Sequence, residues 1–142
     1  MSNRNLLQPE NESPPDGIDI DQCVDNYGVG IDTHSKFIQV CVLQRTGSKL
    51  VRFENTFTTC YDDLLTARDW IIAIVSAHLN GNDDFHYTIE STGTYHFPII
   101  RALQGVPRVV NPLIAGCARR KTDTLDARLL SYHDITGLWK DS

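Results

Sequence analysis

Apolar and polar residues alternate in three short segments that follow one another from residue 27 onward. Residues 27–32 form a short apolar run, and residues 37–43 and 50–57 alternate with a period of two. Such alternation is typical of β-strands with one buried face, and Arg45-Thr46-Gly47-Ser48 has the composition of a turn. Because the connections are short, the pattern predicts an antiparallel meander of three strands.

The pattern changes to a helical period after this meander. Residues 62–79 carry a broad apolar face, with Thr58 or Thr59 as the expected N-cap and Asn80-Gly81 as the end of the helix. Shorter elements follow, and their limits are less sharply marked.

Strands and helices alternate in the second half of the chain. Strands are expected at residues 85–90 and 106–110, with a short helix capped by Thr94 between them. The Asn111-Pro112 pair is typical of a helix start, and a last helix is expected over about residues 123–135.

This element order predicts a mixed α/β sheet, in which an antiparallel three-strand meander is followed by helix-linked strands. It is the order of the ribonuclease H-like, or resolvase-like, fold. The longest apolar run, residues 70–75, is far shorter than the roughly 20 residues of a membrane span, and the first residues lack the pattern of a secretory signal. We therefore expect a cytoplasmic protein with no membrane partner.

Acidic charge is concentrated at the start of the chain. The formal net charge is −5, and residues 1–26 hold six acidic residues against one basic residue. These residues are rich in Asn, Asp, Ser and Pro and lack apolar periodicity, so we expect an acidic disordered tail. Residues 27–136 are then the folded domain, which is formally neutral, and the acidic total does not argue against binding to nucleic acid.

The chain offers oxygen ligands rather than sulfur or nitrogen ligands for a metal ion. Its four cysteines lie far apart without CxxC spacing, and its five histidines show no paired-ligand spacing. We therefore expect reduced thiols and no zinc site.

Two acidic residues stand where apolar strands end, Asp32 and Glu90. A charged side chain at the end of a core strand needs a partner. A turn that bonds local amides would explain Asp32, and a salt bridge would explain Glu90. If the two strands are neighbours, however, the acids face each other at the edge where α/β sheets bind ligands.

Two further acids, Asp123 and Asp126, lie three residues apart in a helix-like stretch, so both are expected on one helical face. Singly, Asp123 would complement a helix dipole and Asp126 would pair with nearby arginines. Together with Asp32 and Glu90 they form four carboxylates that need a compensating charge. A hard cation such as Mg²⁺ supplies it, and carboxylate-held Mg²⁺ breaks and joins phosphodiester bonds.

Basic and aromatic residues lie close to these acids in sequence. A solvated basic face is the usual meaning of such cations, and beside a carboxylate cluster they would also suit contacts with DNA phosphates. Thr92 and Tyr95 follow Glu90 in a loop that is either a helix-capping turn or a nucleic-acid contact through a hydroxyl group and a stacking ring. The basic candidates for DNA binding are Arg119, Arg120, Lys121 and Arg128.

The motifs occur in a familiar order. They are Gly30-Ile31-Asp32-Thr33-His34-Ser35-Lys36, Glu90-Ser91-Thr92-Gly93-Thr94-Tyr95-His96, Val110-Asn111-Pro112 and Ala118-Arg119-Arg120-Lys121-Thr122-Asp123-Thr124-Leu125-Asp126-Ala127-Arg128. Over about residues 27–135 the chain closely resembles the N-terminal catalytic domain of the DEDD insertion-sequence transposases, the family that includes the pilin-gene invertases.

This resemblance implies a fold like that of Holliday-junction resolvases and makes Asp32, Glu90, Asp123 and Asp126 the DEDD quartet. The quartet would bind Mg²⁺, with Mn²⁺ able to replace it, for DNA strand cleavage and transfer in transposition. Some members are guided by a structured RNA, and a homo-oligomer is expected of the full-length protein. Full-length relatives carry a C-terminal domain with a serine implicated as the nucleophile.

Residues 137–142 are expected to begin the linker to that second domain, which this chain lacks. Two functions stay open: the metal-binding half of a transposase, or a truncated, non-catalytic fragment that binds guide RNA, DNA or the parent transposase as a regulator. Metal-dependent nicking of a junction substrate would separate them. A third, half of an actin-like ATPase, also begins with a Gly-Ile-Asp strand, but no Gly-rich phosphate loop favours it.

Overall fold

A computed structural model describes residues 10–12, 23–90, 96–110 and 126–137. A six-stranded sheet with the strand order β1-β4-β3-β2-β5-β6 forms its centre. The predicted meander is confirmed, because β2 and β4 both pair antiparallel with β3. The predicted helix-linked strands are also confirmed, since β5 runs parallel to β2 and β6 parallel to β5. The strands are β1 (Glu10–Glu12), β2 (Tyr27–Thr33), β3 (Phe37–Thr46), β4 (Lys49–Thr58), β5 (His86–Glu90) and β6 (Val106–Val110).

This topology is the mixed α/β sheet of the ribonuclease H-like fold, as the element order predicts. One strand was not expected. Glu10–Glu12 lies inside the segment predicted to be a disordered tail, yet it pairs antiparallel with β4 at the edge of the sheet.

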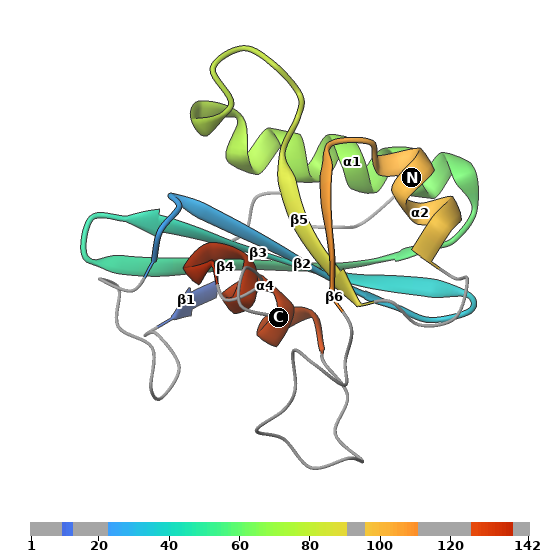
Figure 1. Ribbon diagram of the computed structural model, residues 1–142, viewed down its shortest axis with the longest axis horizontal. Coiled ribbons are helices and arrows are strands. Elements are labelled where there is room, and N and C mark those ends of the chain that lie inside the picture. The colour runs from blue at the N-terminus through green and yellow to red at the C-terminus, as the bar shows by residue number, and fades with distance from the viewer. Residues whose placement is uncertain (1–9, 13–22, 91–95, 111–125, 138–142) are drawn as a thin grey trace.

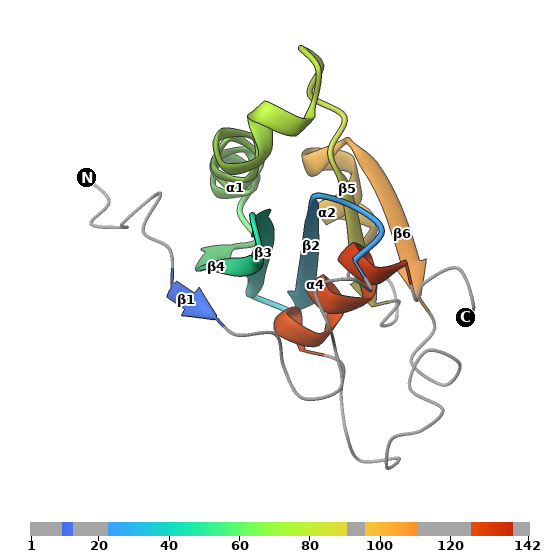
Figure 2. The same ribbon diagram turned by 90° about the vertical axis from the view of Figure 1, so that its left-hand side faces the viewer.

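Helices cover both faces of the sheet. α1 (Tyr61–Val75), which continues into the 3₁₀ turn η2 (Ser76–His78), and α2 (His96–Leu103) lie on one face. α4 (Ala127–Thr136) lies on the other (Figures 1 and 2). The helix after Asn111-Pro112 and the cap at Thr94 fall outside the described residues.

The predicted caps of α1 are wrong. Its N-cap is Cys60, which makes no side-chain capping bond. Instead Asp63, in the first turn, accepts a hydrogen bond from the backbone nitrogen of Thr58 at 2.5 Å. The carboxylate thus reaches back to the strand end, and its negative charge also suits the positive end of the helix.

The main hydrophobic core lies between the sheet and α1 and α2. Alternate residues of the central strands point into it, among them Val29 and Ile31 of β2, which are fully buried. Phe57 of β4 meets Trp70 of α1 with ring centroids 5.7 Å apart. Each such side chain contributes about 1.5–3 kcal/mol of burial free energy, so this layer supplies most of the hydrophobic stabilisation.

Two glycines on the opposite face of β2 let α4 lie directly on the strand. A Cβ atom on Gly28 would stand 2.5 Å from the carbonyl oxygen of Ser131, and one on Gly30 would stand 2.2 Å from that of Ala127. Both distances are shorter than any tolerable contact. Because side chains alternate along a strand, Asp32 shares this face with the two glycines and lies just beyond the first turn of α4.

The second half of α4 is fixed by a buried carboxylate. Asp134 is fully buried and accepts hydrogen bonds from four groups on three strands. The donors are the Val29 nitrogen of β2 (2.8 Å), His86 Nδ1 (2.6 Å) and Thr88 Oγ1 (2.8 Å) of β5, and Arg108 Nη1 (3.1 Å) of β6. Multiple donors, one of them a guanidinium, offset the cost of removing this carboxylate from water.

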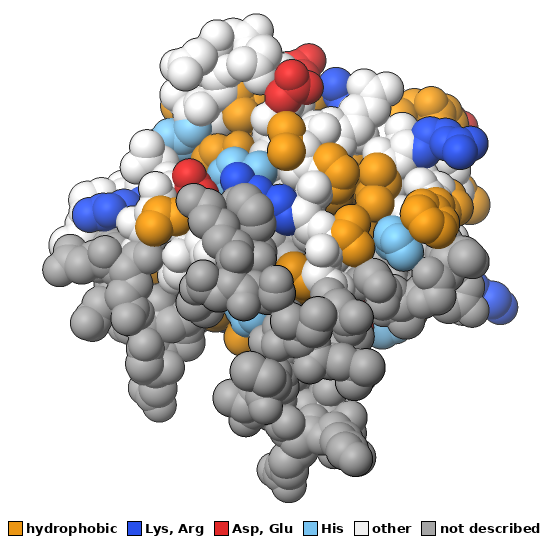
Figure 3. Space-filling view, viewed as in Figure 1, with side chains coloured by type: hydrophobic (Ala, Val, Ile, Leu, Met, Phe, Trp, Pro, Cys, Tyr) orange, Lys and Arg blue, Asp and Glu red, His pale blue; other side chains and the backbone are white. Residues whose placement is uncertain are grey.

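Exposed apolar side chains gather on one side of the molecule. Phe97 of α2 and Val106 and Val109 of β6 are about half exposed, and Figure 3 shows apolar side chains around these two elements. β6 is the outermost strand at this end of the sheet. Among the described residues, no helix has the length and apolar character needed to cross a membrane.

Candidate functional site

A row of polar side chains crosses the sheet at the N-terminal end of α4. Asp32 of β2 lies directly opposite Gln39 of β3, and Gln39 lies opposite Thr56 of β4. These residues occupy the same face as Gly28 and Gly30, one step further along the strands. α4 covers the glycine positions and begins where this row begins, so the row is left uncovered by the helix.

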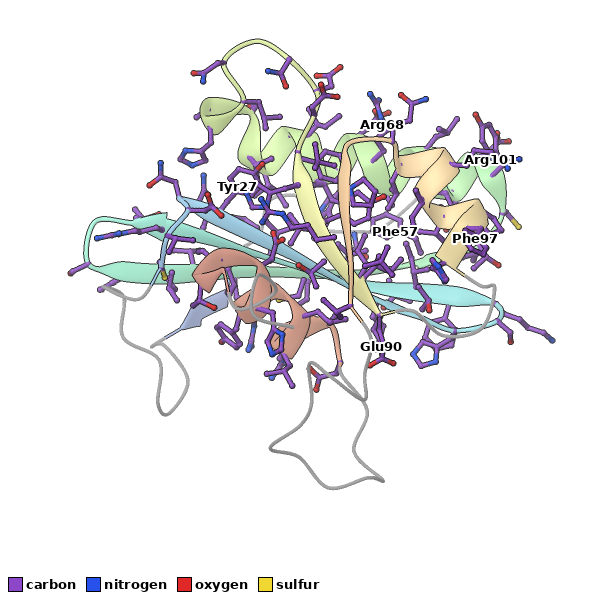
Figure 4. All side chains as sticks on the ribbon, viewed as in Figure 1. Tyr27, Phe57, Arg68, Glu90, Phe97 and Arg101 are labelled. Carbon is purple, nitrogen blue, oxygen red and sulfur yellow. The ribbon has the colours of Figure 1, made fainter. Side chains whose placement is uncertain are left out.

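Glu90 extends the row onto β5. Gly30 pairs with Thr88 and Ile31 with Ile89, so the next residues in the parallel register are Asp32 and Glu90. The Thr88 hydroxyl reaches Asp134 of α4, which places the even-numbered side chains of β5 on the α4 face. Figure 4 shows Glu90 at the end of β5, pointing away from α1 and α2. The two strands are therefore neighbours, which is the condition that the sequence left open.

Asp126 stands at the start of α4 as its N-cap. Its backbone is extended (φ −91°, ψ 173°), and its carboxylate accepts a hydrogen bond from the Leu129 nitrogen at 2.9 Å. The helix begins at Ala127 rather than near Asp123, so the prediction that Asp123 and Asp126 share one helical face is wrong for Asp126. Asp123 itself lies outside the described residues, as do Thr92, Tyr95, Arg119, Arg120 and Lys121.

The pKa of the Asp32 carboxyl group depends on its burial and on two neighbouring side chains. Only 17% of the side chain is exposed, and His34 Nε2 lies 3.0 Å from Oδ2. Burial raises the pKa of Asp32, the charge and hydrogen bond of His34 lower it, and the charge of Asp126 raises it, with a net upward shift. Asp32 and Asp126 are thus close enough to repel each other, although they are 94 positions apart in sequence.

This arrangement suits a hard cation. Carboxylate oxygens are the ligands that Mg²⁺ prefers. Burial is the main cause of the raised pKa of Asp32, and a cation between Asp32 and Asp126 would offset the smaller contribution from the charge of Asp126. Within the described part of the chain, no three acidic, His or Cys side chains are grouped closely enough to hold an ion. Asp32, Glu90 and Asp126 lie at the same end of the central strands and do not by themselves form such a group.

A cleft of about 480 Å³ adjoins Asp126. Its lining includes Gln39 of β3, Glu54 and Thr56 of β4, and Asp126, Ala127 and Arg128 at the start of α4. Glu54 Oε2 accepts from Arg128 Nε at 2.6 Å and also lies 2.7 Å from Arg52 Nε. The side chain of Arg128 is 53% exposed, so this predicted DNA-binding residue faces solvent beside the carboxylates.

Comparison with known proteins identifies the family. Residues 29–132, from β2 into α4, match the IS110 family of DEDD transposases, whose description is "Transposase". The chain belongs to this family. The match covers most of the chain and both elements that carry Asp32 and Asp126, so the resemblance inferred from the motifs is confirmed.

Other comparisons add little about this transposase domain. No curated protein matches it. Among solved structures, the PPX-GPPA enzyme of Aquifex aeolicus is similar at 11% identity with a TM-score of 0.38, over 61% of this chain and 36% of that one. The ethanolamine utilization protein EutJ of Carboxydothermus hydrogenoformans is similar at 13% identity with a TM-score of 0.40, over 70% and 43%. The transposase domain thus spans less than half the length of either protein.

The sequence analysis assigned no role to three residues that the structure places at this site. His34 lies in the first motif and contacts Asp32 directly, and its ring stacks on Phe37 with centroids 4.3 Å apart. Gln39 and Thr56 join the row only through strand pairing. Both could have been found from the alternation of side chains along a strand. Once the meander and its register are known, every second residue of β3 and β4 must share the face of Asp32.

Proposed function

We propose that this chain is the N-terminal catalytic domain of a DNA transposase, a site-specific recombinase that cleaves and transfers DNA strands. In this proposal Asp32, Glu90, Asp123 and Asp126 bind Mg²⁺. Family membership supports the transposase assignment. One observation carries the metal site: Asp32 and Asp126 are brought together from distant parts of the chain, and the charge of Asp126 contributes to the raised pKa of Asp32.

When bound, the ion would neutralise negative charge and polarise a phosphate. The residues of the chain determine where it binds. Asp32 and Glu90 project from neighbouring parallel strands, which fixes their separation through the backbone ladder. Asp126 is held by its own capping bond to Leu129, so its second oxygen is directed by the end of the helix. Asp32, Glu90 and Asp126 thus belong to two strands and a helix N-terminus, which hold their backbone in place.

DNA is the proposed substrate and partner. Arg128, two residues after Asp126 and half exposed, is placed to contact a phosphate of a strand lying at the carboxylates. Arg119, Arg120, Lys121, Thr92 and Tyr95 stay predictions for the same role. A structured guide RNA and a homo-oligomer of the full-length protein belong to this proposal as further partners.

Metal binding tests the proposal without requiring cleavage. Titration of the chain with Mn²⁺, followed by electron paramagnetic resonance, should show a bound ion that Mg²⁺ displaces. Asp32→Asn and Asp126→Asn should each weaken binding at least about tenfold, since each removes one charged ligand. Asp69→Asn is the matched control, because Asp69 is a largely exposed acid on α1. Equal binding by all four proteins would refute the metal site.

Cleavage of DNA is the second measurement. With Mg²⁺ the chain should nick a branched DNA junction, and Asp32→Asn should abolish nicking while leaving the melting temperature at or above that of the wild type. A chain that binds Mn²⁺ and DNA but nicks no junction would support the binding-fragment alternative instead.

A further inference from the structure

We propose that the cleft beside Asp126 binds a nucleotide of the DNA strand whose phosphate lies at the carboxylates, and that Gln39 and Thr56 contact this nucleotide. This inference rests on the proposed function and names where its substrate strand leaves the metal site. The cleft lies at the β4 end of the polar row, and its lining includes Asp126 itself.

The spacing of the row suits a nucleic-acid strand. Neighbouring strands of a sheet are about 4.8 Å apart, so Thr56 lies roughly 10 Å from Asp32 across β3. A stacked strand rises about 3.4 Å per nucleotide, so this span covers two or three nucleotides. A strand with one phosphate at Asp32 and Asp126 therefore brings a nucleotide two or three positions along the strand over Gln39 and Thr56.

The chemistry of the cleft suits a nucleotide as well. A volume of about 480 Å³ is within the range of small-ligand sites and accommodates one base with its sugar. The Gln39 amide offers both donors and an acceptor, and the Thr56 hydroxyl offers one of each; both residues are exposed. Such neutral groups read a base edge or a sugar oxygen without adding charge beside the metal ligands.

Arg128 is the cationic residue of the cleft lining, which also contains the carboxylates of Glu54 and Asp126. Glu54 pairs with Arg128 and with Arg52, which lies outside the lining. The pairing of Arg128 with both Glu54 oxygens, at 2.6 and 3.4 Å, fixes the guanidinium at the mouth of the cleft. Glu54 is therefore a positioning residue, which orients Arg128 toward the phosphate that follows the bound nucleotide.

Other occupants fit less well. A second cation is disfavoured by the two arginines at Glu54, which already compensate its charge. A peptide segment with apolar anchors would need an apolar lining, whereas most of the residues that line this cleft are polar or charged. Continuity with Asp126 is the feature that selects the DNA strand, because the site of chemistry and the cleft share a residue.

Binding of a fluorescein-labelled single-stranded DNA, measured by anisotropy with the full chain in Mg²⁺, tests the inference. The double variant Gln39→Ala/Thr56→Ala should bind about three- to tenfold more weakly, the loss expected for one or two neutral hydrogen bonds. Thr46→Ala, an exposed threonine at the far end of β3, should bind like the wild type. Melting temperatures are compared in parallel to exclude unfolding.

Salt dependence separates the two kinds of contact. The double variant should leave the slope of log Kd against log salt unchanged, because Gln39 and Thr56 neutralise no phosphate. Arg128→Ala should reduce that slope by about 0.7, the value for one phosphate contact on a single strand. Glu54→Gln should weaken binding, since Arg128 loses the partner that orients it. If the double variant binds like the wild type while Arg128→Ala does not, the nucleotide site is refuted.

Cross-linking distinguishes failure of this inference from failure of the proposed function. A DNA strand carrying 4-thiothymidine should cross-link to the peptides that contain Gln39 and Thr56. Cross-links confined to other peptides, in a chain that binds DNA and Mn²⁺, would overturn the cleft assignment and leave the transposase proposal standing. A wild-type chain that binds no DNA would overturn both, and an RNA strand captured in place of DNA would refute the stated occupant.

Discussion

The two ends of helix α4 each carry an aspartate, and the two aspartates are treated in opposite ways. Asp134 is fully buried and accepts four hydrogen bonds from strands β2, β5 and β6. Asp126 is exposed and accepts a hydrogen bond from the Leu129 nitrogen in the first turn of its own helix. At the C-terminal end, the Asp134 carboxylate is fully engaged in hydrogen bonds that hold the fold together. At the other end the Asp126 carboxylate is left available beside a second carboxylate, Asp32.

The C-terminal half of α4 thus stabilises the fold, whereas its N-terminal end carries a residue of the proposed metal site. The Asp134 network ties α4 to the sheet, and the helix then carries that rigidity to Asp126 a little over two turns away. Asp126 itself contributes one capping bond, through Oδ1, to its own position. Four changes would break or sharpen this contrast.

Asp134→Ala should have the largest effect. It leaves the His86, Thr88 and Arg108 donors without their buried acceptor, which costs about 3–5 kcal/mol of unfolding free energy. Urea denaturation followed by circular dichroism measures it. Asp69→Ala on α1 is the control and should change stability by less than about 0.5 kcal/mol. A loss below about 1 kcal/mol for Asp134→Ala would show that this end of α4 is not held by the network.

Gly30→Ala should destabilise the protein by about 2–3 kcal/mol, because the added methyl group enters the space of the Ala127 carbonyl. The direction of the change in unfolding free energy is informative, because replacing a glycine by alanine inside an ordinary strand tends to stabilise the protein. Thermal melting monitored by circular dichroism gives the value. An unchanged melting temperature would mean that α4 can move away from β2 at no cost.

Asp126 permits its two roles to be separated. Asp126→Ala should cost about 1 kcal/mol through loss of the N-cap, whereas Asp126→Asn should be nearly neutral, because Asn caps helices as well as Asp does. Both should lose Mn²⁺ affinity to a similar extent. If Asp126→Asn kept full metal affinity, the carboxylate would serve the helix alone.

Asp32→Asn should give a small and favourable change: about 0.5–1 kcal/mol more stability without metal. The pKa of Asp32 in the folded state is raised above its ordinary value of 3.8, so protonation favours the fold. That stability is fully present below pH 3.8 and is lost as the pH rises through the folded pKa. Melting curves of variant and wild type should therefore differ at pH 7 and converge at low pH.

Added Mg²⁺ should reverse the order at pH 7, stabilising the wild type but not Asp32→Asn. A variant less stable than the wild type in EDTA would contradict the assignment of Asp32 as an unfavourably buried charge.

Local pattern was enough to predict the strands, because period-two alternation in residues 37–43 and 50–57 reports a half-buried sheet directly. It was not enough for the start of α4. An aspartate at position 126 is compatible with either the first turn of a helix or its N-cap. Which of the two it becomes depends on where α4 meets the sheet, and that cannot be deduced from the local sequence. The helix was therefore predicted to begin near Asp123 rather than at Ala127.

Contacts that depend on tertiary packing were missed for a physical reason. Asp134 looks like one more polar residue of a helix, since its donors lie 26 to 105 residues away. Gly28 and Gly30 contribute nothing to the hydrophobic pattern. They matter because a side chain at either position would clash with the backbone of α4. Asp32 and Glu90, by contrast, were identifiable because each interrupts an apolar run.

The packing of α4 on β2 also determines when, during synthesis of the chain, Asp32 and Asp126 can come together. The bond from the Val29 nitrogen to Asp134 joins residues 105 positions apart. At a synthesis rate of about 5–20 residues per second, β2 emerges from the ribosome roughly 5–20 s before the helix that lies on it. During that interval Asp32 has no Asp126 beside it. Under the proposed ligand set, a nascent chain therefore holds at most two of the four carboxylates until the start of α4 has been made.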